Sequence, residues 1–224
     1  MKQFASKTAA VAICALGLFA AALPASAGVL TYNFNLDQCT GGCGLSNYGS
    51  VTVTDVAGGG VTVHLALLNV SGLISSGALD HHSLVFNLSG APAATITGLP
   101  SFWSYTGPTS YTPNSGFFGT FDYIINCNAA CAPNNPYTSP LDFAITTASI
   151  TTASFIDGGT AAHAFFVGDI SNPNGGNALT GRIGATLSND PPPTNVPEPL
   201  TASLFGAGLI GVTALRRRKA RKQL

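Results

Sequence analysis

Hydrophobic and polar residues alternate along several short segments of the chain. The clearest case is the Val-Thr-Val-Thr segment 51–54, followed by a glycine-rich turn at 57–60 and a second alternating segment at 61–67. Because successive side chains of a strand point to opposite faces of a sheet, this pattern predicts a β-hairpin with one buried face. Alternation or runs of β-branched residues predict further strands at 29–34, 84–88, 121–125, 141–152, 162–170 and 182–187.

Signals for helices are missing from the same part of the chain. No segment between residues 28 and 189 repeats its hydrophobic residues with the 3.6-residue period of an amphipathic helix. Gly, Thr, Ser and Asn are common and charged residues are rare, which suits short strands joined by polar turns. We therefore expect one all-β domain at 28–189, an antiparallel sandwich for which a jelly-roll-like arrangement is one form. The proline- and glycine-rich span 91–119 is expected to be a long turn-rich connection.

The first 27 residues have the composition of a secretory signal peptide. Two lysines precede the apolar stretch 8–23, and Ala25 and Ala27 supply the small residues of a cleavage site. An uncleaved membrane anchor would need a longer apolar stretch. We therefore expect a signal peptidase to remove residues 1–27 and to leave Gly28 as the first residue of the mature protein.

The character of the chain changes again after residue 189. Residues 190–195 form a proline-rich spacer that favours an extended conformation, and residues 200–215 are apolar and uncharged. As a helix, this apolar segment would be about 24 Å long, slightly short of a bilayer core of about 30 Å. The basic tail 216–224 would hold the C-terminus in the cytoplasm by the positive-inside rule. A plain C-terminal membrane anchor is the simplest interpretation of this segment.

The order of motif, apolar segment and basic end at residues 196–224 is more specific than an anchor. The residues that define it are Val196, Pro197, Glu198 and Pro199 in the motif, and Arg216, Arg217, Arg218 and Lys219 in the tail. This order resembles the PEP-CTERM sorting domain, in which a Pro-Glu-Pro motif precedes a short transmembrane helix and a basic end. The resemblance implies an exosortase-type membrane protease as partner, an inner-membrane precursor, and delivery to the cell surface or the extracellular space of a Gram-negative bacterium that makes exopolysaccharide.

The formal net charge of zero hides an uneven distribution of charges. Of nine basic residues, two lie in the predicted signal peptide and six in the basic tail, which leaves Arg182 alone between them. Eight Asp residues lie between positions 28 and 195, so one positive charge against eight negative charges gives −7 for that part. A surface of this kind repels polyanions, and we exclude nucleic acid as a partner.

Four cysteines lie outside the predicted signal peptide, in two C-x3-C pairs. Thiols of exported proteins tend to oxidise, so disulfides are expected, and four cysteines allow three connectivities. We favour pairing within each C-x3-C segment, each closing a small loop; a four-thiolate zinc site is the alternative. The cysteines are Cys39, Cys43, Cys127 and Cys131.

No catalytic group stands out in the domain. It lacks a G-x-S-x-G elbow, an H-E-x-x-H helix and a phosphate loop, and it contains no Glu before position 198. Asp80, His81 and His82 could bind a metal or act as a general base, but adjacent side chains of a strand point to opposite faces, so turn or surface residues are expected. We predict no catalytic residue, no metal site and no cofactor, and hence a non-enzymatic protein.

Aromatic residues gather between positions 102 and 118. Trp103, Tyr105 and Tyr111 could stack on sugars, since a planar ring covers the apolar face of a pyranose; the other interpretation is that these rings cap an open end of the sandwich. The leading hypothesis is an exported surface or matrix protein linked to exopolysaccharide or biofilm. A carbohydrate-binding or adhesion module is the alternative, followed by a secreted hydrolase that uses two Asp residues.

Overall fold

The computed structural model describes residues 27–39, 43–68, 72–75, 81–113, 116–128, 131–172 and 179–188. They belong to one compact unit, Ala27–Thr194. Nearly all of the predicted signal peptide, the spacer 190–195 and the sorting segment 196–224 lie outside the described residues. No helix among the described residues is both long and apolar enough to span a bilayer.

The described residues form short strands and almost no helix. A short 3₁₀ helix, η2 (Thr152–Ser154), lies between the ninth and tenth strands. The strands are β1 (Val29–Cys39), β2 (Gly49–Asp55), β3 (Val61–Leu67), β4 (Gly72–Leu73), β5 (Leu84–Leu88), β6 (Ile96–Thr97), β7 (Trp103–Thr106), β8 (Tyr123–Cys127), β9 (Leu141–Ile145), β10 (Phe155–Ile156), β11 (Phe166–Asn172) and β12 (Leu179–Leu187).

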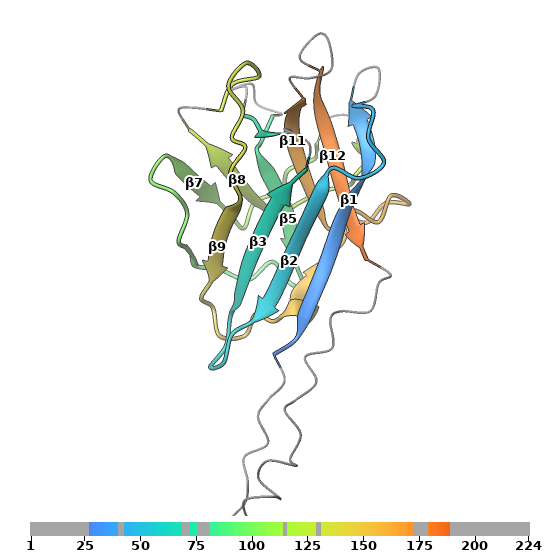
Figure 1. Cartoon of the computed structure of the whole chain (residues 1–224). Helices are drawn as coiled ribbons and strands as arrows, with labels where there is room; N and C mark the ends of the chain where they lie inside the picture. Colours follow the sequence, from blue (N-terminus) through green and yellow to red (C-terminus); the bar gives the residue numbers. More distant parts are fainter. Residues whose placement is uncertain are drawn as a thin grey trace, which may run out of the picture. The chain divides into compact units, whose positions relative to one another are not determined.

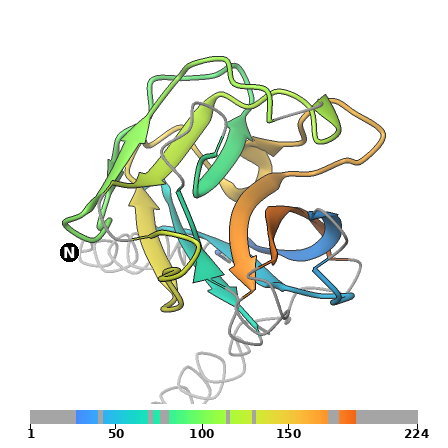
Figure 2. The ribbon, with the colours of Figure 1, turned by 90° about the horizontal axis from the view of Figure 1, so that it is seen from above.

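The strands pair into one continuous sheet within the described part of the chain. Its order is β6-β9-β3-β2-β1-β12-β11-β5-β8-β7, with β10 beside β5 and β4 beside β11, and the pairs are antiparallel. The sheet curls until it is nearly closed, so that its strands surround a common interior (Figures 1 and 2). Phe86 on β5 and Phe143 on β9 lie far apart along this path, yet their rings stack with centroids 6.2 Å apart. The prediction of an antiparallel all-β domain is confirmed.

The predicted hairpin is confirmed as β2 and β3. Val61, Val63 and Leu65 on β3 are buried, whereas Thr62 and His64 between them are exposed. The buried side chains of β3 belong to the main core. Full burial of each Val or Leu side chain stabilises the fold by about 1.5–3 kcal/mol relative to exposure. The glycine-rich turn between the strands carries no core residue, as its sequence indicated.

Strand β5 is buried on both faces. Leu84, Phe86 and Leu88 point into the main core, whereas Val85 belongs to a second cluster on the outer face of the sheet. This second cluster includes Phe118 and Phe121, from the aromatic span between β7 and β8. Two short strands that were not predicted, β6 and β7, lie within the turn-rich span 91–119. Alternation failed to reveal β7, since three of its four residues are exposed in succession.

The strand registers define two ends of the sheet. We call the end with Val29 the proximal end and the end with Cys39 the distal end. The Ser188 nitrogen donates to the Thr31 carbonyl oxygen (2.8 Å), so the domain begins and finishes at the proximal end. Cys39 pairs with Gly181 at the distal end.

Both predicted disulfides are confirmed and lie at the distal end. Cys39–Cys43 follows β1, with Cα atoms 5.5 Å apart. Cys127–Cys131 follows β8, with Cα atoms 5.9 Å apart. The register β12–β11–β5–β8 carries the distal end from Cys39 to Cys127, so the two bridges brace loops on the same end of the sheet.

Candidate functional site

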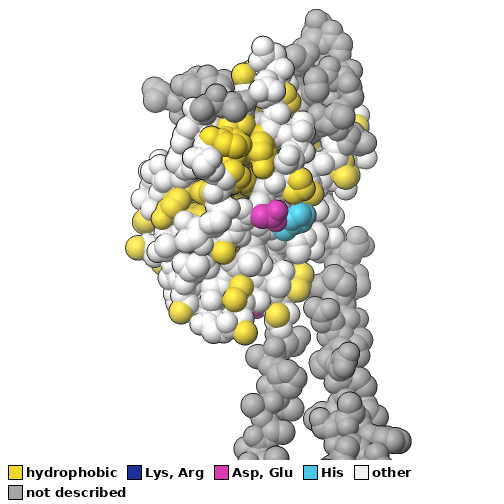
Figure 3. All heavy atoms as spheres, turned by 60° about the vertical axis from the view of Figure 1, so that its left-hand side comes forward, with side chains coloured by type: hydrophobic (Ala, Val, Ile, Leu, Met, Phe, Trp, Pro, Cys, Tyr) yellow, Lys and Arg dark blue, Asp and Glu magenta, His cyan; other side chains and the backbone are white. Residues whose placement is uncertain are grey.

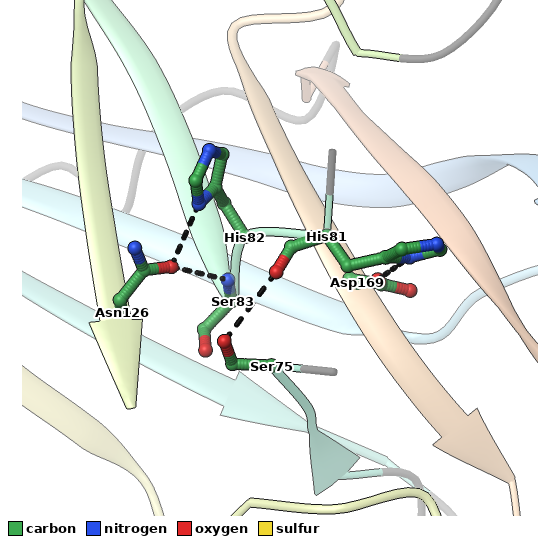
Figure 4. A network of polar contacts seen from close by, with 6 residues as sticks. All are labelled: Ser75, His81, His82, Ser83, Asn126 and Asp169. Carbon is green, nitrogen blue, oxygen red and sulfur yellow. Dashed lines mark hydrogen bonds and ion pairs between the residues drawn. The ribbon is translucent and has the colours of Figure 1, made fainter. Parts of the chain in front are cut away.

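A network of polar residues lies at the distal end, between β5, β8 and β11 (Figure 4). His81 is in the loop before β5, and its Nδ1 lies 2.6 Å from Asp169 Oδ2 on β11. The Asp169 side chain is only 1 % exposed, while the His81 side chain is 36 % exposed. The buried Asp169 carboxylate thus fixes the His81 ring, part of which is exposed at the surface. We call His81, Asp169 and Arg182 the distal charge cluster.

Arg182 joins this cluster through the sheet register. It pairs directly with Asp169 across β11 and β12, and directly opposed residues of an antiparallel pair share one face. Arg182 is 9 % exposed. A buried carboxylate is therefore placed beside the one basic side chain between residues 28 and 195. A buried charge is tolerated when an opposite charge or hydrogen-bond donors lie close to it.

His82 turns away from the distal charge cluster (Figure 4). Its Nδ1 lies 3.0 Å from Asn126 Oδ1 on β8, and its ring meets the Tyr111 ring edge-on with centroids 4.4 Å apart. Asn126 Oδ1 also accepts a long hydrogen bond from the Ser83 nitrogen (3.4 Å). The two adjacent histidines therefore contact different strands, His81 contacting β11 and His82 contacting β8. Asp80 lies outside the described residues.

The chemistry of His81 follows from the carboxylate on Nδ1. Such a bond places the ring proton on Nδ1 and leaves Nε2 as the acceptor, which is the orientation that carboxylates give to catalytic and metal-binding histidines. The hydroxyl of Ser75 donates to the backbone carbonyl oxygen of His81 (3.4 Å) and not to the ring. The geometry thus orients a histidine without pairing it with that serine as a nucleophile.

Two more His–Asp pairs lie on the surface. His64 Nδ1 and Asp142 Oδ1 are 2.6 Å apart, with side chains 52 % and 70 % exposed. His163 Nδ1 and Asp157 Oδ2 are 2.8 Å apart, and this hydrogen bond holds the pKa of Asp157 below its usual value. These pairs are solvated, and exposed ion pairs contribute about 0–1 kcal/mol. The pair in the distal charge cluster is set apart by its burial.

A second acidic group at the distal end organises the first disulfide loop. Asp37 accepts hydrogen bonds from the nitrogens of Cys39 (2.7 Å) and Cys43 (2.8 Å) and from the Tyr48 hydroxyl (2.5 Å). Asp37, Cys39 and Cys43 are close enough for their side chains to surround a metal ion. The two sulfurs are joined in a disulfide, however, so they are not thiolate ligands. This group is therefore structural.

Tyr48 and Tyr32 are expected to ionise only in strong alkali. Burial, and for Tyr48 also the hydrogen bond to Asp37, raises the pKa of each hydroxyl to about 12, from 10. The folded pKa lies above the unfolded pKa, so the stabilisation is complete below pH 10 and is lost as the pH rises to 12. Tyrosinate absorbance, recorded after jumps from neutral to alkaline pH, would measure the ionisation of the two tyrosines. Urea unfolding at each pH would measure the loss of stability. Tyr48→Phe should remove one late-titrating group; unchanged titration would contradict the assignment.

The predicted sugar-stacking residues do not form one platform. Trp103 is 6 % exposed and packs against Phe102 and Tyr137, whereas Tyr111 packs against His82. Of the three predicted residues, Tyr105 is exposed, at 37 %. Trp103 belongs to the main core, whereas Tyr111 packs against the second cluster. In Figure 3, hydrophobic side chains gather toward the distal end, and no Lys or Arg side chain of the described residues is visible on that face.

The predicted processing residues are only partly described. Ala27 is exposed and Gly28 is partly buried at the start of β1, while Ala25, the sorting motif Val196–Pro199 and the basic residues from Arg216 onward lie outside the described residues. Neither Asp169 nor Asn126 was predicted from the sequence as a site residue. A usable signal was an Asp inside the apolar segment 164–170, where burial requires a partner.

Comparisons with protein-family models, curated proteins and solved structures give no match to this chain.

Proposed function

We propose that the chain is an exported, non-enzymatic surface or extracellular-matrix protein of a biofilm-forming Gram-negative bacterium, sorted by an exosortase-type protease. The observation that carries this proposal is the tail, in which Val-Pro-Glu-Pro at 196–199 precedes an uncharged segment at 200–215 and a basic end. The signal peptide at 1–27 would direct the domain out of the cytoplasm. A jelly-roll-like sandwich is the form that we propose for the curled sheet.

Two properties of the domain support export. Both C-x3-C pairs are disulfides, which persist in oxidising compartments outside the cytoplasm. Residues 28–195 carry eight Asp and one Arg, so removal of the two ends would leave a strongly acidic product. Acidic proteins stay soluble and do not adhere to polyanions, which suits a component of a hydrated matrix.

The chain ends of the described domain lie together at the proximal end. The segments that we propose as targeting signals therefore leave from one end of the sheet, and the two disulfides lie at the other. Stacking on exopolysaccharide by Trp103 is not part of the proposal, because that ring is buried.

The test is replacement of the sorting motif in the full chain. Pro197→Ala combined with Glu198→Ala should leave an uncut precursor in the inner membrane and reduce the surface fraction at least about tenfold, because the protease would no longer recognise the tail. Fractionation and mass analysis of the product would measure this. Pro191→Ala combined with Pro192→Ala, in the spacer, is the matched control and should be processed normally. Normal delivery of the motif variant would refute the sorting proposal.

A further inference from the structure

One aspartate holds the backbone of Gly28 at the proximal end. The Gly28 nitrogen donates to Asp55 Oδ2 (3.1 Å), and the Asp55 nitrogen donates to the Gly28 carbonyl oxygen (2.8 Å). Ala27, one residue earlier, is exposed. Among the described residues, Gly28 thus makes two hydrogen bonds to Asp55 just before β1, directly after the bond that the sequence marks for cleavage.

The carboxylate of Asp55 is itself fixed by a second element. Asp55 Oδ1 accepts from the Thr152 nitrogen (2.6 Å), and Oδ2 accepts from the Thr152 hydroxyl (3.4 Å). Thr152 begins η2 and is 7 % exposed. A carboxylate that is held by a distant part of the chain is already in place to receive a cation, without reorganisation of its side chain.

The contact requires glycine at position 28. A Cβ atom on this residue would lie 2.5 Å from Asp55 Oδ2 and 2.9 Å from Thr152 Oγ1. These distances are shorter than non-bonded carbon and oxygen atoms allow. Any larger residue would push the carboxylate away from the backbone nitrogen.

We propose that Gly28 is the amino terminus of the mature protein and that its α-ammonium group forms an ion pair with Asp55. This inference rests on the proposed function, because it needs removal of the signal peptide after Ala27. Water hydrolyses the Ala27–Gly28 peptide bond, which leaves a carboxylate on Ala27 and an amine on Gly28; the amine takes up a proton at neutral pH. The Gly28 amide, which donates one hydrogen bond to the Asp55 carboxylate, is thereby replaced by an ammonium group with three donors and a full positive charge.

The charge content of the domain makes this new cation important. Residues 28–195 contain no Lys and a single Arg, so the α-ammonium group would be their second positive charge. Cleavage one residue later would remove Gly28 and leave Asp55 without this partner. Earlier cleavage would place the amine beyond Gly28, on the exposed side of the contact. The Gly28–Asp55 contact thus matches the cleavage position that the Ala-Ser-Ala sequence indicates.

The test uses the full gene product. The protein would be expressed with its own signal sequence in an exporting host, purified, and its N-terminus identified by mass. In uniformly ¹³C-labelled protein, the pH dependence of the Cα resonance of residue 28 then reports the protonation of the unmodified α-amine. We expect an α-amine pKa about one unit above the ordinary 7.7–8.0, which is a tenfold stronger hold on the proton.

Two variants and a control identify the partner. Asp55→Asn should return the pKa of the amine to its ordinary range, and Gly28→Ala should lower it as well while the Ala-Ser-Ala signal stays intact. Asp142→Asn removes an exposed carboxylate whose contact is His64, and should leave the amine unchanged. If Asp55→Asn does not fold, Gly28→Ala provides the same comparison.

The possible failures are distinguishable. A mature N-terminus other than Gly28 would overturn this inference together with the predicted cleavage position, while the sorting role of the tail would still be tested by the motif variants. An N-terminus at Gly28 with an ordinary pKa that Asp55→Asn does not change would overturn the ion pair alone.

Discussion

Replacing Asp169 with alanine is expected to lower the free energy of unfolding by about 3 kcal/mol. The side chain is 1 % exposed and holds His81 Nδ1 at 2.6 Å. Its removal deletes this bond and also takes a negative charge from beside Arg182, which is 9 % exposed and directly opposite in the register. Removing one member of a buried charged group is costly because the other charge stays in a poorly solvated place. Urea unfolding at pH 7 would measure the loss.

The His64–Asp142 pair provides a matched control for this prediction. Its ring-to-carboxylate distance is also 2.6 Å, but its side chains are 52 % and 70 % exposed. Asp142→Ala should therefore cost no more than about 1 kcal/mol. Asp169→Asn, which keeps the shape and removes the charge, should fall between the two alanine variants. Equal losses for Asp169→Ala and Asp142→Ala would show that burial does not distinguish the distal charge cluster.

Replacing Gly119 with alanine should destabilise the domain even more, by about 4 kcal/mol. Gly119 has a φ of +98°, and a Cβ atom there would lie 1.7 Å from the Gly158 carbonyl oxygen. That oxygen also accepts a hydrogen bond from the Thr120 nitrogen (3.1 Å). The two backbones would have to separate, and the cover that Phe118 gives to the outer face of β5 would be disturbed. Thermal unfolding followed by circular dichroism would report the change.

Gly90 separates backbone strain from steric clash in this prediction. Its φ is +75°, yet nothing lies within 4 Å of the place where its Cβ would be. Gly90→Ala should therefore cost about 1 kcal/mol, from the left-handed conformation alone. If Gly119→Ala were no more harmful than Gly90→Ala, the close approach to Gly158 would not be a constraint of the fold.

Local patterns predicted the elements that depend on neighbouring residues. The β2–β3 hairpin follows from alternation over 51–67, and β5 was predicted with its observed bounds, 84–88. The two disulfides join cysteines four positions apart, so their pairing was also local. Strands β6 and β7 were missed because they form through backbone pairing with β9 and β8, while their own residues are few and mostly exposed.

The candidate sites depended on distant residues and were largely hidden. His81 was noticed, but its partner Asp169 lies 88 positions away in the sequence. Only the strand order β12-β11-β5 places Asp169 beside both His81 and Arg182. The sequence left two interpretations of Trp103, sugar stacking or capping of the sandwich, and the fold buries this ring against Tyr137. Composition shows which residue types are present for such contacts, but it does not determine which residues are in contact with one another.

The sequence by itself determined the all-β class, the short-range disulfides and the acidic character of the middle of the chain, because alternation, spacing and charge are properties of neighbouring residues or of simple counts. The processing and sorting predictions also come from the sequence alone, because targeting signals are short linear segments. Only the tertiary structure decided which carboxylate is buried, which aromatic rings are covered and that Gly28 rests on Asp55. Those outcomes depend on strand order and on the curl of the sheet, which bring together groups 27 to 97 positions apart and set how much water each one retains.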